Sequence, residues 1–181
     1  MEELSCGYNA IPSLNLRGNT GLQILRCSNN PIAQLDLSAN AEISRLYIDG
    51  CLLSEINLSG NPKLDSLDCS RLHLNELDLS RNEALSYLRC EECGLTSLDL
   101  THNPVLSSLY CNDNALTNLD FSNNPDLGTL ECRNNKLTSL DLSHNTSLSR
   151  LDYRGNPDLG EVDISMLHYL EELNEHTRGQ G

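Results

Sequence analysis

Apolar and polar residues alternate in short segments that return every 21 residues along the chain. A Leu-x-Cys segment begins at Leu4 and recurs without an insertion as far as Leu151. A second segment, Leu-Asp-Leu, begins at Leu14 and recurs on the same period as far as Leu140, then returns one residue late as Val162-Asp163-Ile164. Alternation points the outer residues of each segment inward and the middle one to solvent. The pattern predicts eight coils with two strand-like segments each, the second being either a true strand or an irregular extended segment.

Each segment is preceded, three positions earlier, by a further apolar residue, as Leu85 precedes Leu88 and Leu95 precedes Leu98. A coil thus contributes about six inward side chains at roughly 1.5–3 kcal/mol each, and such coils fold only as neighbours in a stack. We therefore expect a mainly β repeat solenoid over residues 1–165. Its curvature should be low, because both halves of a coil have the same extended type and nearly equal rise. Residues 166–181 lose the pattern and are expected to form a C-terminal cap or tail, the cap being either a short amphipathic helix or the opening of a ninth coil.

Asparagine occupies two columns of this repeat. The column after the second segment is unbroken, and buried Asn side chains there are expected to form a ladder that bonds free backbone groups at the turns. Its members are Asn19, Asn40, Asn61, Asn82, Asn103, Asn124 and Asn145. The column after the first segment is interrupted in the middle coils, and it reads Asn9, Asn30, Cys51, Leu72, Cys93, Asn114, Asn135 and Asn156.

Cysteines follow the repeat as well. Six of them occupy one inward column, in which Ile48 and Tyr153 take the place of Cys in the two remaining coils, and they are Cys6, Cys27, Cys69, Cys90, Cys111 and Cys132. A thiol that alternates with an aliphatic group acts as a small buried hydrophobe, so we expect free, unreactive thiols. Cys90 and Cys93 form a Cys-x-x-Cys pair, but no second pair follows at zinc-site spacing.

The histidines, His73, His102, His144, His168 and His176, are scattered. His102 and His144 share a column but lie two coils apart, roughly 10 Å at about 4.8 Å per strand, which is too far for one metal ion. No nucleophile stands beside a His and a carboxylate in a way that the repeat leaves unexplained, and there is no glycine-rich phosphate loop. We therefore expect no metal, no cofactor, no catalytic residues and no enzymatic activity.

Composition narrows the range of partners. Asp and Glu number 26 against 12 Lys and Arg, which gives a formal charge of -14 and argues against direct binding of nucleic acid or an anionic membrane. No apolar run is long enough to span a membrane, and the N-terminal residues Met1 to Leu4 do not resemble an export signal. The expected location is the cytoplasm, while a secreted or effector role stays open.

The segment Leu-x-x-Leu-x-Cys-x-x-Asn, as in Leu22 to Asn30, Leu106 to Asn114 and Leu127 to Asn135, resembles the conserved part of leucine-rich repeats. The other half of the coil, for example Leu137 to Leu142, repeats the same spacing. The chain more narrowly resembles the nested 21-residue class called IRREKO, found mainly in bacterial proteins. This resemblance implies a right-handed solenoid with a parallel sheet along one face, a second sheet or extended segments opposite, and a protein-binding role. No N-terminal cap precedes Leu4, so end-to-end self-association through the first coil also stays open.

The outward positions of the two segments differ in chemistry. In the second segment the middle residue is Asp in six coils and Asn in two, and a Ser or Thr follows in every coil but the first. In the first segment the outward residues change from coil to coil and hold six of the ten arginines and three tyrosines, the types most frequent at protein interfaces. The predicted partner-binding residues are Arg26, Arg45, Tyr47, Tyr87, Arg89, Tyr110, Arg133, Arg150 and Arg154.

Four interpretations of these faces stay open at this stage. The first hypothesis is a non-enzymatic scaffold that binds a protein partner of unspecified identity through the variable Arg and Tyr positions. The alternative is an acidic mimic of a nucleic acid backbone that inhibits a DNA-binding protein through the Asp column. A third is binding of divalent cations between neighbouring Asp side chains. The simplest is that exposed Arg and Tyr only keep the sheet soluble and unaggregated.

Overall fold

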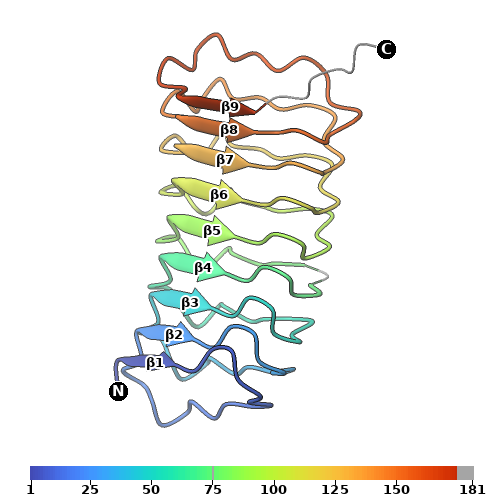
Figure 1. Ribbon diagram of the computed structural model, residues 1–181. Coiled ribbons are helices and arrows are strands. Elements are labelled where there is room, and N and C mark those ends of the chain that lie inside the picture. The colour runs from blue at the N-terminus through green and yellow to red at the C-terminus, as the bar shows by residue number, and fades with distance from the viewer. Residues whose placement is uncertain (75, 175–181) are drawn as a thin grey trace.

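The computed structural model describes residues 1–74 and 76–174, which form nine short parallel strands joined by turns (Figure 1). The sheet runs in chain order from β1 to β9. The strands stand one above another in a nearly straight column, which confirms the repeat solenoid of low curvature expected from the period. Their bounds are β1 Glu3–Ser5, β2 Ile24–Arg26, β3 Arg45–Tyr47, β4 Ser66–Asp68, β5 Tyr87–Arg89, β6 Ser108–Tyr110, β7 Thr129–Glu131, β8 Arg150–Asp152 and β9 Glu172–Asn174.

The register of the sheet repeats the sequence period. The central leucine of each strand pairs with that of the next, from Leu4 with Leu25 onward, in steps of 21 residues. In the last pair, Leu151 with Leu173, the two leucines are one residue further apart in sequence than in the other pairs. This extra residue accounts for the one-residue delay of the second segment in that coil. The sheet therefore continues beyond residue 165 into a ninth coil, and residues 166–174 contain a strand and no helix. The rest of the expected cap or tail, with His176, lies outside the described residues.

The core is a column of aliphatic and thiol side chains between the two halves of each coil. In the fifth coil Leu85, Leu88 and Cys90 are fully buried, and the same positions are buried in the coils on either side. At the N-terminal end Leu4 and Cys6 are only partly buried, because neighbours cover them from one side alone. Coverage by adjacent coils is thus what buries the core, as expected for a stack.

The second segments are extended but form no sheet. No backbone bond joins one of these segments to the next within the described residues, and the nearest bonds, such as Ala115 N to Leu95 O, lie before the segments. The carbonyl that ends each segment is used by turns and by the Asn ladder, as at Leu79, whose oxygen accepts from Asn82 N and from Asn103 Nδ2. Asn103 Nδ2 also donates to Asn82 O, and this pair of bonds recurs from Asn40 to Asn145. Side-chain bonds therefore take the place of a second sheet, which settles the choice between a strand and an extended segment.

The ladder after the first segment is more continuous than its sequence suggests. Asn114 Nδ2 donates to Cys90 O, 24 residues earlier, at 2.8 Å. At the equivalent positions the thiols of Cys51 and Cys93 donate to Cys27 O at 3.4 Å and to Cys69 O at 3.1 Å. Cysteine thus replaces Asn as a weak donor to the same carbonyl, and among the ladder positions of the central coils only Leu72 has no donor.

Candidate partner-binding site

The outward side chains of the strands make one continuous surface, here called the sheet face. It consists of the residues one before, one after and three after each central leucine, and its members in neighbouring coils lie side by side. All nine residues predicted to bind a partner lie on it. The structure gathers them into three groups along the stack: Arg26, Arg45 and Tyr47; Tyr87, Arg89 and Tyr110; and Arg133, Arg150 and Arg154.

Aromatic contacts organise the first two groups. The rings of Tyr87 and Tyr110 pack against each other with centroids 5.5 Å apart and a tilt of 42°. The guanidinium of Arg26 lies over the ring of Tyr47, with its carbon 5.2 Å from the ring centroid. All three tyrosines are half-buried, so their rings are held in place while part of each stays accessible.

Five of the six arginines of the sheet face are anchored by carboxylates that sequence analysis did not single out. Arg89 contacts Glu91 at 2.5 Å and Arg150 contacts Glu131 at 2.9 Å. The side chains of Glu91 and Glu131 are 13% and 15% exposed, whereas the arginines are 44% and 45% exposed. The carboxylates thus form a lower layer and the guanidiniums lie above it. Further ion pairs join Arg26 to Glu3, Arg133 to Asp113 and Arg154 to Asp152.

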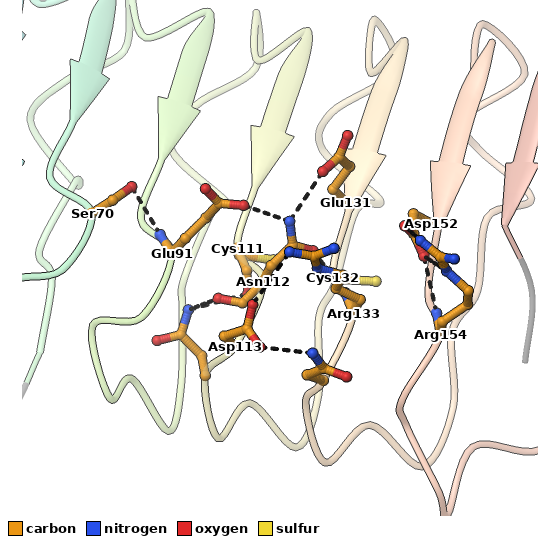
Figure 2. Close-up of polar contacts among 12 residues, drawn as sticks. Ser70, Glu91, Cys111, Asn112, Asp113, Glu131, Cys132, Arg133, Asp152 and Arg154 are labelled. Carbon is orange, nitrogen blue, oxygen red and sulfur yellow. Dashed lines mark hydrogen bonds and ion pairs between the residues drawn. The ribbon is translucent and has the colours of Figure 1, made fainter.

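A buried amide connects this lower layer between coils (Figure 2). Asn112 is fully buried, and its Nδ2 donates to Glu91 at 2.5 Å and to Glu131 at 3.0 Å. Its Oδ1 accepts from Arg133 N, and Glu91 N donates to the hydroxyl of Ser70. One neutral side chain therefore separates two carboxylates and fixes their positions across three strands. The signal available in the sequence was the single Asn in a column otherwise occupied by Gly, Ser and charged residues.

The Asp column on the opposite side has a structural role. Each of these carboxylates accepts a hydrogen bond from the backbone N–H two residues later, as Asp120 does from Ser122 and Asp141 from Ser143. These bonds hold the pKa of both carboxyl groups below its ordinary value. Asn57 makes the same contact to Ser59, so an amide oxygen can also close this turn.

Cysteine chemistry agrees with a packing role. All eight thiols are free, and seven are buried. Burial raises the pKa of Cys132 to about 12 and that of Cys90 and Cys111 well above its ordinary value, so these sulfurs stay protonated and poorly nucleophilic. Within residues 1–74 and 76–174 no three metal-binding side chains come together. No helix in that part of the chain is long and apolar enough to cross a membrane.

Comparison with solved structures places this geometry among leucine-rich-repeat folds. No family model and no curated protein matches the sequence, but solved structures do. The functional domain of InlJ from Listeria monocytogenes, described as including a cysteine ladder, is 26% identical; the match covers 96% of this chain and 53% of that one, with a TM-score of 0.59. Internalin C2 from the same species is 20% identical over 96% of this chain and 80% of its own, with a TM-score of 0.91.

A plant structure shows the same fold. The leucine-rich-repeat ectodomain of the Arabidopsis thaliana receptor kinase GASSHO1/SCHENGEN3, solved in complex with CASPARIAN STRIP INTEGRITY FACTOR 2, is 22% identical over 96% of this chain and 24% of that one, with a TM-score of 0.76. The chain is thus a leucine-rich-repeat solenoid with bacterial counterparts. It spans about half the length of the InlJ structure, 53%.

Proposed function

We propose that the chain is a non-enzymatic scaffold that binds a protein partner through the sheet face, and that its coils belong to the nested 21-residue class of leucine-rich repeats. The observation that supports this most is the Tyr87–Tyr110 ring pair at the middle of the sheet, flanked by arginines that carboxylates already hold. Tyr presents a large contact area with little loss of side-chain entropy, and anchored arginines lose less freedom on binding. Such a surface is preorganised, so that binding a partner costs little further side-chain entropy.

The Asp column on the opposite side gives less support for a binding function. Its Asp carboxylates are explained by the turns that they close, and the contact survives replacement of Asp by Asn. The proposal therefore does not include mimicry of a nucleic acid backbone. The plant receptor structure, solved in complex with CASPARIAN STRIP INTEGRITY FACTOR 2, supports recognition of a separate factor by this fold.

Affinity capture from a lysate of the organism that encodes the chain tests the proposal. The wild type is compared with Tyr87→Ala/Tyr110→Ala on the sheet face and with Asp99→Asn/Asp120→Asn on the opposite side. The second variant is a matched control, because Asn closes the same turn. We expect the tyrosine variant to keep its circular dichroism spectrum and lose the captured protein, while the Asp variant retains it. Equal capture by the tyrosine variant and the wild type contradicts the proposal.

A further inference from the structure

From the first coil to the eighth, each carboxylate of the sheet face is paired with an arginine, with a single exception among the described residues. Glu3, Asp49, Glu91, Glu131 and Asp152 each form an ion pair with an arginine. Asp68, in β4, has no ion pair within the described part of the chain. Among the sheet-face carboxylates of these eight coils, only that of the fourth coil therefore lacks a paired arginine.

Asp68 is half-buried, so part of its side chain stays accessible. Its Oδ1 accepts a hydrogen bond from Ser70 N at 3.1 Å, and its neighbours across the strands are Tyr47 and Arg89. Arg89 is already bound by Glu91. Burial raises the pKa of Asp68 above its ordinary value, with a smaller lowering by Arg89. A partly desolvated carboxylate without an ion pair of its own costs free energy, which a cation of the partner would recover.

The arginines of the sheet face show the reciprocal exception. Arg26, Arg89, Arg133, Arg150 and Arg154 each contact a carboxylate. Arg45, in β3, is exposed and forms no ion pair with any described residue.

Arg45 and Asp68 lie close together on adjacent strands. Asp68 is opposite Tyr47, and Arg45 is two residues from Tyr47. At about 3.3 Å per residue and about 4.8 Å between strands, the two Cα atoms are about 8 Å apart. Ser66 and Ser70, the other outward residues of the fourth coil, have short side chains, whereas longer side chains flank them in the third and fifth coils.

We propose that this part of the sheet face receives a peptide segment of the partner that places a Lys or Arg side chain on Asp68 and an Asp or Glu side chain on Arg45. The proposal rests on the proposed function and specifies the chemistry of the partner. Tyr47 lies between the two charges and Tyr87 lies beside Ser66, so aromatic rings flank the cation as well as the carboxylate that binds it. Complementary charges of this kind fix orientation and exclude partners with the opposite arrangement.

Parallel selections from random peptides displayed on phage test the proposal, with wild type and Asp68→Asn as the two targets. Asn preserves the acceptor for Ser70 N, so the variant keeps the local hydrogen bond. We expect peptides enriched on the wild type to combine a basic and an acidic residue, to bind Asp68→Asn at least about tenfold more weakly, and to bind Arg45→Gln more weakly too. Replacing the basic residue of such a peptide by Glu should restore binding to Asp68→Arg.

The outcomes separate this inference from the function on which it rests. Peptides that lose binding on Tyr87→Ala/Tyr110→Ala but bind Asp68→Asn as well as the wild type overturn the charge assignment and leave the sheet face as the binding surface. Peptides that are indifferent to all of these substitutions contradict both. Equal enrichment of basic residues in the two selections also overturns the assignment.

Discussion

The surroundings of two aspartates, Asp68 and Asp120, shift their pKa values in opposite directions. Burial raises the pKa of Asp68 on the sheet face, whereas hydrogen bonds from Ser122 lower the pKa of Asp120 on the opposite side. A raised pKa means that the folded chain holds the proton more tightly than the unfolded chain does. The charge of Asp68 therefore costs stability at neutral pH, and the charge of Asp120 contributes to it.

Asp68→Asn should raise the stability of the protein at pH 7. The gain should shrink as the pH falls through the raised pKa of Asp68, since the wild-type carboxyl then becomes neutral as well. Asp120→Asn serves as the control with the opposite sign: it should lower stability at pH 7, and its deficit should fade as the pH falls toward the lowered pKa of Asp120. Urea denaturation of the three proteins between neutral and acidic pH measures both effects. A gain from Asp68→Asn that does not depend on pH would show that its charge is not the cause.

Residue types and alternation were sufficient to place Arg26, Tyr47, Tyr87 and Tyr110 on one face. They were insufficient to find the carboxylates beneath the arginines. Three of the five contacts join side chains about 20 residues apart, such as Arg150 and Glu131, and the other two, such as Arg89 with Glu91, join residues of one coil. Which arginine reaches which carboxylate depends on rotamers in neighbouring coils, and the period carries no information about them. The unpaired state of Asp68 and Arg45 is visible only after every other pair has been identified.

At the scale of the element, the Asn ladder supplies the hydrogen bonds between coils that a second sheet would otherwise supply. Each Asn between Asn40 and Asn145 donates two bonds to carbonyls of the preceding coil, while its own Oδ1 is buried and accepts none from the described residues. Asn19 belongs to the first coil that the structure describes, and its side chain makes no hydrogen bond within the described residues. The same residue type thus contributes differently according to its place in the stack.

Asn103→Ala should destabilise the protein by about 1–3 kcal/mol, because the oxygens of Leu79 and Asn82 each lose a donor in a site closed to water. Asn19→Ala is the matched control and should cost much less. Free energies of unfolding from urea titrations give the comparison. Equal losses at the two positions would mean that the ladder bonds contribute little and that the Asn side chain acts locally.

The period predicted the first sheet and its register but left the form of the second segment open, for a physical reason. Alternation of apolar and polar residues is the same in a paired strand and in an unpaired extended segment. The difference lies in which donor reaches the carbonyl, and at Leu79 it is a turn N–H and the amide of Asn103. The thiol donors Cys51 and Cys93 were missed likewise, since a Cys at a ladder position is indistinguishable in sequence from one chosen for packing.

At the scale of the whole molecule, charge is distributed unevenly around the solenoid. From the first coil to the eighth, the sheet face holds six arginines and six carboxylates. The net charge of -14 is therefore carried by the rest of the chain. Ion pairs on the surface contribute little each, and unbalanced carboxylates elsewhere repel one another. Self-repulsion should therefore outweigh the ion pairs in the response of the fold to salt.

Raising the salt concentration from about 0.01 M to about 0.15 M, which shortens the screening length from about 30 Å to about 8 Å, should raise the urea midpoint of the wild type. Glu55→Gln/Glu83→Gln/Glu161→Gln removes three exposed carboxylates that have no ion pair among the described residues. This variant should be more stable than the wild type at low salt and should gain less from added salt. A midpoint that falls with salt would instead assign the dominant electrostatic contribution to the ion pairs of the sheet face. In that case the arginines anchored above Glu91 and Glu131 would be holding the coils together as well as presenting a surface.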